Sequence, residues 1–181
     1  YEKTTNTMRN ILFTLALLIS FSSFGQNFSN EESELYNLIM KYRSSKNLPR
    51  IPISKSLTFV AQTHVRDLEN NKPDLGNCNM HSWSNKGAWT SCCYTSDHAK
   101  AQCMWDKPSE LTSYKGYGYE IAYGNSSGSV TPIGAINGWK GSSGHNAVII
   151  NQGIWSSHPW EAIGIGIYKG FAVVWFGEER Q

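Results

Sequence analysis

The chain has 181 residues and a formal net charge of +2, with seven tryptophans and nine tyrosines. A charge this close to zero argues against nucleic acid or a membrane surface as the main partner, because both are bound largely through clustered positive charge. The aromatic content is high for this length, and the composition favours a place in the core over a place in a binding groove.

The first 25 residues have the pattern of a secretory signal sequence. Met8 and Arg9 open a basic stretch, "ILFTLALLISF" is apolar but too short to span a bilayer, and "SFG" offers small residues for cleavage. We therefore predict upstream sequence at 1–7, a signal peptide at 8–25 and a single domain at 26–181. The mature protein is expected to be secreted, to the extracellular space or the periplasm, with no transmembrane segment.

Two amphipathic helices are predicted at the start of the mature chain. Ser29 and Glu32 form a capping-box pattern, and apolar residues then recur at helical spacing through Tyr42. After the break "PRIP", a second apolar stripe runs through Leu57, Val60, Ala61, His64 and Leu68. Because His64 shares this stripe, we interpret it as a core histidine satisfied by hydrogen bonds rather than as a ligand.

All four cysteines lie in a long polar connection between Asn70 and Thr112, which we expect to contain one short helix near "SDHAKAQCMW". In an exported chain, disulfides are the default interpretation. Bonding between the neighbours Cys92 and Cys93 would be strained, so Cys78 is expected to pair with one of them and Cys103 with the other. A zinc site is the lesser alternative, since no C-x-x-C pair is present.

The C-terminal half predicts further short elements. The segment "GYGYEIAYG" places Glu120 between apolar neighbours, where a carboxylate needs a partner. "VTPIGAINGW" predicts a helix capped by Thr131, with Ile133, Ile136 and Trp139 facing inward. A second short helix, "HNAVII", follows a serine cap. The alternation in "IGIGI" and the run "FAVVWF" predict a β-hairpin with one apolar face and one glycine face. The order of elements predicts a single α+β domain.

Two catalytic patterns are weak in this sequence. "GNSSG" matches the G-x-S-x-G nucleophile elbow around Ser126, but no acidic residue lies between this serine and the later histidines. We interpret it as a loop. A cysteine peptidase site of Cys93 and His145, oriented by Asn151, would need a free thiol, whereas bonded sulfur is expected here.

Three polar residues in apolar or glycine-rich settings remain as candidates for a site: His81, Glu120 and His145. Two histidines and a carboxylate can bind a divalent cation, with zinc the first choice. His145 lies at a predicted helix N-terminus, where the local positive potential favours the neutral imidazole that ligation needs.

The order of motifs resembles the CAP superfamily, which comprises cysteine-rich secretory proteins, antigen 5 and pathogenesis-related 1 proteins (SCP domains). The resemblance rests on a histidine in "MHS", on "GYEIAYG", on W-x-x-S-x-G-H-N and on a terminal "IGIGI…VVWFG". It covers about Glu31 to Gly177 and is closest to the bacterial branch. It implies an α-β-α sandwich with a central antiparallel sheet.

The resemblance also implies a cavity built from two histidines and two acids. His81 and His145 match the histidines, and Glu120 matches the first acid. Ile121 replaces an asparagine of the family pattern, and the second acid has no counterpart among residues 140–142. Family members bind lipids, divalent cations or proteins, and peptidase activity has been proposed for some.

From these residues we expect a secreted, monomeric binding protein for a lipid, small-molecule or protein ligand. His81 and His145 would hold a divalent cation, with Glu120 as orienting acid or third ligand. One alternative is a hydrolase in which Glu120 works with a histidine to activate water. Another is a purely structural hydrogen-bond network of the same three residues.

Overall fold

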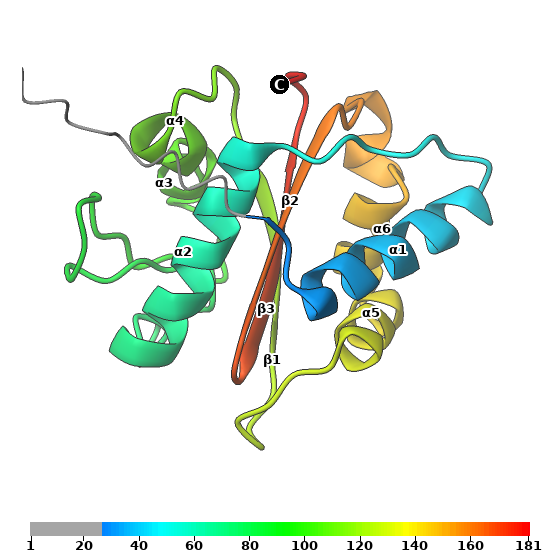
Figure 1. Ribbon diagram of the computed structural model, residues 1–181. Coiled ribbons are helices and arrows are strands. Elements are labelled where there is room, and N and C mark those ends of the chain that lie inside the picture. Colours follow the sequence, from blue (N-terminus) through cyan, green and yellow to red (C-terminus); the bar gives the residue numbers. More distant parts are fainter. Residues whose placement is uncertain (1–26) are drawn as a thin grey trace, which may run out of the picture.

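The computed structural model describes residues 27–181, so the predicted upstream and signal segments lie outside the described residues. Its elements are, in chain order, α1 (Asn30–Ser44), α2 (Lys55–Asn71), α3 (Ala101–Trp105), α4 (Lys107–Leu111), β1 (Tyr119–Gly124), α5 (Pro132–Gly141), α6 (Ser143–Ile149), the 3₁₀ helix η1 (Gly153–Ser157), β2 (Ala162–Tyr168) and β3 (Phe171–Gly177). Figure 1 shows the sheet edge-on between two helical layers, α2, α3 and α4 on one side and α1, α5 and α6 on the other. The predicted α-β-α sandwich is confirmed.

The sheet is antiparallel, with strand order β1-β3-β2. The predicted hairpin forms β2 and β3, and it turns at Lys169, whose φ is 48°. The segment around Glu120 pairs with the other side of β3, where Glu120 lies opposite Trp175. Strand β1 is therefore an edge strand, and the helical layers can meet beyond it.

Alternation along the strands divides the interior into two cores. On β3, Ala172, Val174 and Phe176 pack with α1, α5 and α6, whereas Val173 and Trp175 pack against the α2 layer. The same period of two turns Ile121 of β1 towards the first core. Its neighbour Glu120 consequently faces the α2 layer. The sheet thus directs a buried carboxylate at a helix.

Helix α2 contains the whole predicted stripe from Leu57 to Leu68. The side chain of Ser54 accepts a hydrogen bond from the backbone N–H of Leu57, and Lys72 ends the helix in a left-handed conformation. The capping box of Ser29 and Glu32 is also present in α1. One expectation for α5 was wrong: Ile133 is 51% exposed, and Ala135 is buried in its place beside Ile136 and Trp139. The buried stripe therefore runs through Pro132, Ala135, Ile136 and Trp139, which keeps two of the three predicted positions.

The glycine face of β2 contacts the α2 backbone directly. A Cβ atom on Gly164 would lie 2.0 Å from the carbonyl carbon of Leu57, and one on Gly166 would lie 2.4 Å from the carbonyl oxygen of Ala61. Only residues without a side chain allow this approach. The apolar face of β2, with Ile163 and Ile165, fills the opposite core.

Gly164→Ala is expected to lower the free energy of unfolding by roughly 1–3 kcal/mol, because neither backbone can move without opening the core. Gly141→Ala is the matched control, since its Cβ would have nothing within 4 Å. Urea unfolding followed by tryptophan fluorescence measures both. Equal midpoints for the two variants would contradict the close contact between α2 and β2.

The cysteines pair as Cys78–Cys93 and Cys92–Cys103, one of the two arrangements allowed by the sequence. All four cysteines of the sequence are therefore bonded. The connection between α2 and β1 holds two short helices, of which α3 falls in the predicted segment and α4 does not. No helix within the described residues has both the length and the apolar character needed to cross a bilayer.

Candidate functional site

Glu120 is the centre of a buried hydrogen-bond network. Its carboxylate accepts a hydrogen bond from Nδ1 of His64, which comes from α2, and another from Nδ1 of His81, at 2.7 Å. The side chains of Glu120 and His64 are both fully buried, whereas that of His81 is 18% exposed. Two of the candidate residues are therefore joined, together with a third residue that was not a candidate.

His64 carries a proton on each ring nitrogen. Its Nε2 lies 2.9 Å from the carbonyl oxygen of Ser82, which can only accept a hydrogen bond, and its Nδ1 faces the Glu120 carboxylate. Burial alone would lower the pKa of His64, but the charge and hydrogen bond of Glu120 raise it overall. Conversely, burial would raise the pKa of Glu120, and the charges and hydrogen bonds of His64 and His81 lower it. The two residues form a buried ion pair.

His81 is held on the loop that follows Cys78. Its backbone N–H donates to Oδ1 of Asn79 at 3.0 Å, and its ring lies edge-on to Tyr94 with the centroids 5.2 Å apart. The disulfide to Cys93 fixes the start of this loop. Because Nδ1 donates to Glu120, Nε2 is left to face the cavity.

His145 lies in the first turn of α6 and lines the same cavity as His81 and Glu120. Among the described residues its side chain makes no hydrogen bond, so it is a neighbour of the network and not a member. Burial lowers the pKa of His145, and the charge of nearby His81 adds to this effect. The imidazole is thus held in its neutral form.

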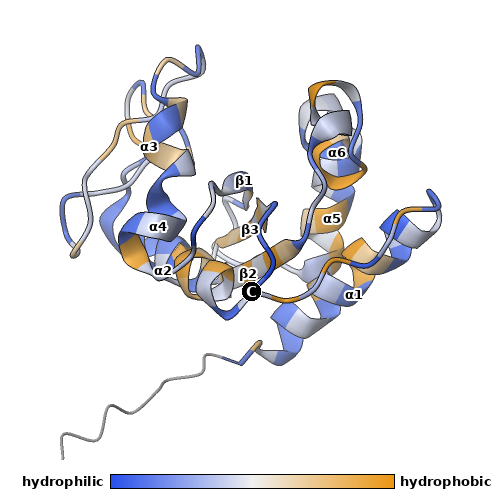
Figure 2. Cartoon of the chain, turned by 90° about the horizontal axis from the view of Figure 1, so that it is seen from above, coloured by the Kyte–Doolittle hydropathy of each residue, from blue (hydrophilic) through white to orange (hydrophobic). Residues whose placement is uncertain are grey.

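The cavity measures about 560 Å³ and lies beyond the edge strand β1. Residues of α3, α6 and η1 line it, and Figure 2 shows α3 and α6 on either side of β1. Most of the wall is apolar, formed by Ala101, Met104, Trp105, Ile121, Val148, Ile154 and Trp155. The polar end holds His81, Glu120 and His145, and a second polar pair joins the hydroxyl of Tyr94 to Nδ1 of His98 at 2.9 Å.

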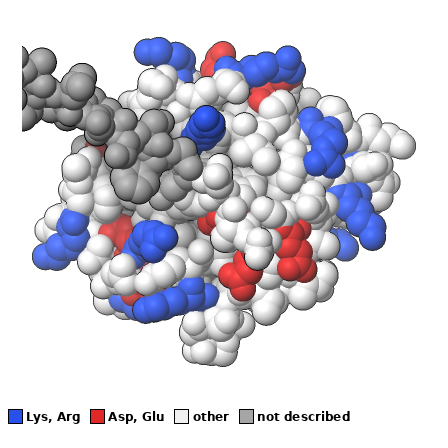
Figure 3. All heavy atoms as spheres, in the orientation of Figure 1, with Lys and Arg blue, Asp and Glu red and all other residues white. Residues whose placement is uncertain are grey.

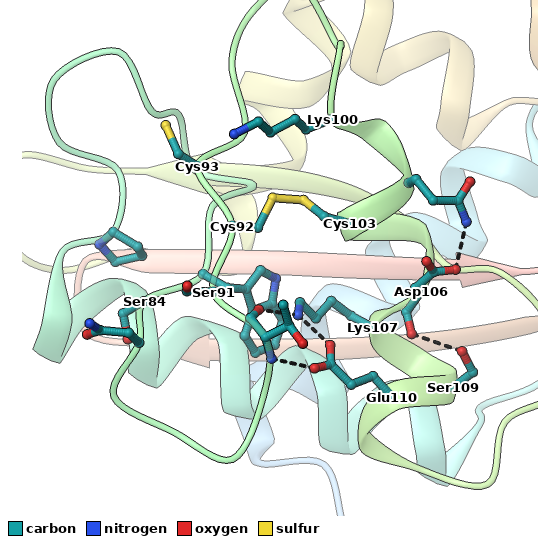
Figure 4. A pocket seen from close by; sticks show the side chains of 15 residues that line it. Ser84, Ser91, Cys92, Cys93, Lys100, Cys103, Asp106, Lys107, Ser109 and Glu110 are labelled. Atoms are coloured by element: carbon teal, nitrogen blue, oxygen red, sulfur yellow. Dashed lines mark hydrogen bonds and ion pairs between the residues drawn. A yellow bond between two sulfur atoms is a disulfide. The ribbon is translucent and has the colours of Figure 1, made fainter.

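A larger and more open hollow, of about 1020 Å³, lies beside the disulfides and contains none of these three candidates (Figure 4). Its buried Lys107 donates to the carbonyl oxygen of Thr90 at 2.6 Å and to the carboxylate of Glu110. This amine is already satisfied. Trp83 lines the hollow and stacks on His64 with ring centroids 4.2 Å apart, so a single indole separates the hollow from the network.

The chemistry open to the site follows from these bonds. Within residues 27–181 no group of three or more His, Cys, Asp and Glu side chains is arranged to hold a metal ion. Both oxygens of Glu120 already accept hydrogen bonds from imidazoles. The geometry therefore gives Glu120 an orienting role towards His81. In the hydrolase alternative the water-activating base would be His81, through Nε2.

Cys93, Ser126 and Asn151, the other residues considered for catalysis, lie outside this site. Cys93 is bonded to Cys78, so it cannot be a thiolate nucleophile. Ser126 lies in an exposed turn after β1, as the loop interpretation requires. Asn151 bonds to Arg43 and to the carbonyl oxygen of His158, which positions the loop of η1 and not His145.

His64 is the functional residue that sequence reasoning missed. It was correctly interpreted as a satisfied core histidine, but its partner is the site carboxylate. A signal was present, because His64 and Glu120 each lie among apolar neighbours and each needs a polar partner.

The fold and site define a cysteine-rich secretory class of protein, and the comparisons agree. The model of the CAP family, described as the cysteine-rich secretory protein family, matches residues 36–170. The chain belongs to this family. No curated protein matches the sequence significantly.

Solved bacterial structures share the fold. An outer surface protein of Borrelia burgdorferi is 17% identical with a TM-score of 0.57, covering 85% of this chain and 96% of its own. An extracellular protein of Bacillus anthracis containing an SCP domain is 18% identical with a TM-score of 0.55, covering 82% of this chain and 40% of its own. A cysteine-rich secretory protein of Staphylococcus aureus is 17% identical with a TM-score of 0.52, covering 83% and 39%. The chain thus spans about two fifths of the latter two proteins.

Proposed function

We propose that this protein is an exported binding protein whose central cavity holds a small molecule. The cavity carries the proposal, because a mostly apolar space of about 560 Å³ with a few polar groups at one end is the usual form of a ligand site. Export is supported by the two disulfides and by solved relatives that are described as outer-surface or extracellular. On the face shown in Figure 3, basic and acidic side chains are interspersed, which gives nucleic acid no continuous basic surface.

Two glycines allow a matched test of the cavity. A Cβ on Gly144, which lines the cavity, or on Gly141, which does not, would meet nothing within 4 Å. Gly144→Trp is expected to fill the cavity and to weaken binding of the neutral fluorescent probe N-phenyl-1-naphthylamine at least about tenfold, whereas Gly141→Trp leaves its affinity unchanged. Equal affinity in both variants would place the probe elsewhere and would refute the proposal.

A divalent cation, zinc first, is a second candidate ligand. The observation that favours it is the free Nε2 of His81, held by a carboxylate on Nδ1, beside the neutral imidazole of His145. A histidine that donates its other nitrogen to a carboxylate is the usual metal-ligating arrangement. His81 and His145 would hold the ion, which would act there as a Lewis acid, and Glu120 would keep the ring of His81 in place.

Equilibrium dialysis against zinc tests this assignment. The wild type is expected to take up one ion per chain at micromolar zinc, and His81→Ala/His145→Ala is expected to take up none. His158→Ala is the matched control, because His158 pairs with Glu178 and does not line the cavity. Absence of uptake by the wild type would eliminate the metal role and leave the small-molecule role standing.

A further inference from the structure

The charges around the cavity disfavour an anionic ligand. The described residues that line it include no lysine and no arginine. The carboxylate of Glu120 is paired with His64 behind the wall. A carboxylate or phosphate group bound there would find no lysine or arginine to pair with, and an unpaired charge in an apolar cavity is costly.

Three neighbouring aromatic residues form part of the wall. The ring of Tyr119 lies with its centroid 6.0 Å from that of Trp105 and 5.3 Å from that of Trp155. All three residues line the cavity, and the two tryptophans are only half-buried. The face of an aromatic ring carries a negative potential, which attracts cations most strongly where water is excluded.

The protein uses aromatic faces elsewhere to hold its own cations. Lys107 lies over Trp83 at 5.4 Å, Lys72 over Phe171 at 5.0 Å and Arg66 over Tyr168 at 4.8 Å. In the part of the chain that the structure describes, no lysine or arginine lies over Trp105, Tyr119 or Trp155. The rings of the cavity wall are therefore available to a cation that comes from outside the chain.

We infer that the cavity takes an organic cation, a substituted ammonium group carrying a small apolar body, against the wall of Trp105, Tyr119 and Trp155. The inference rests on the proposed function, because it names the ligand class of the same cavity. The apolar body packs on Met104, Val148 and Ile154. A hydroxyl or N–H on the ligand can donate to Nε2 of His81.

Three probes of matched shape test the charge preference by displacing N-phenyl-1-naphthylamine. They are benzyltrimethylammonium, its neutral carbon isostere neopentylbenzene, and the anion 3-phenylpropanoate. The cation is expected to bind about 5–30-fold more tightly than the isostere, because the two differ only in the charge that faces the rings. The anion is expected to bind more weakly than either.

Two tryptophan variants test whether the aromatic wall causes the preference for the cation. Trp105→Leu is expected to weaken benzyltrimethylammonium about fivefold or more and neopentylbenzene less than about twofold. Trp89→Leu is the control, since Trp89 is a half-buried aromatic residue outside the cavity lining. Equal affinity for cation and isostere, or tighter binding of the anion, would overturn the ligand class and leave the binding function intact. Failure of every probe, N-phenyl-1-naphthylamine included, would overturn both.

Discussion

Glu120→Gln is expected to lower the free energy of unfolding by roughly 3–5 kcal/mol, the usual cost of removing one partner from a buried ion pair. Glutamine leaves His64 buried without its counter-charge, although both ring nitrogens still face hydrogen-bonding groups. The measurement is urea unfolding at constant pH. Glu178→Gln is the matched control, because the pair of Glu178 and His158 is about one third exposed and is expected to contribute less than about 1 kcal/mol.

Replacing both partners separates charge from packing. His64→Leu/Glu120→Leu removes the pair together with its need for solvation, so it is expected to be less destabilising than Glu120→Gln alone. If the double variant lost as much stability as His64→Leu and Glu120→Leu lose in sum, the two residues would not be coupled as the structure indicates.

The difference in unfolding free energy between the wild type and the double variant is expected to depend on pH. The pKa of Glu120 lies below its ordinary value of 4.5, so its contribution is present above pH 4.5 and is lost as the pH falls through the folded pKa. The pKa of His64 lies above 6.5, so its contribution is complete below pH 6.5 and is lost as the pH rises through the folded pKa. The stability difference between wild type and double variant is therefore expected to be largest between these two pH values. A difference independent of pH would contradict the ion pair.

Removal of either disulfide is expected to cost roughly 3 kcal/mol, since the sequence separations are similar, 11 and 15 residues. The effects on the site should differ. Cys92→Ala/Cys103→Ala releases α3, which supplies Met104 and Trp105 to the cavity wall. Cys78→Ala/Cys93→Ala releases the loop that carries His81.

Two binding measurements distinguish these effects below the unfolding temperature of both variants. N-phenyl-1-naphthylamine is expected to lose affinity mainly when the Cys92–Cys103 bond is removed, and zinc mainly when the Cys78–Cys93 bond is removed. Each variant controls for the general loss of stability in the other. Identical effects on both ligands would show that the bonds stabilise the domain only as a whole.

The elements with local signals could be predicted from the sequence. The caps of α1 and α5, the stripe of α2 and the alternation in β2 and β3 each depend on neighbours within a few residues. Helix α4 could not be predicted in the same way. It is a single short turn held by contacts with residues such as Thr90, which are distant in sequence.

The residues of the candidate site could be predicted from the sequence, but the hydrogen bonds between them could not. Apolar or glycine-rich settings and the family resemblance selected His81, Glu120 and His145, and all three line one cavity in the structure. The role of His64 depends on the register that turns Glu120 towards α2, which no local pattern in either segment encodes. Whether the His145 side chain reaches the network depends, in the same way, on how closely the two helical layers approach each other.

The glycine face of β2 also determines how the cavity can respond to its ligand. Because α2 rests on that strand backbone to backbone, His64 and the carboxylate it pairs with belong to a wall that cannot recede. Other parts of the lining come from the short helix α3 and the one-turn η1, which are tied by a disulfide and by the side chain of Asn151. Ligands of different size would therefore be accommodated by displacement of short elements such as α3 and η1, while Glu120 and His64 keep their geometry.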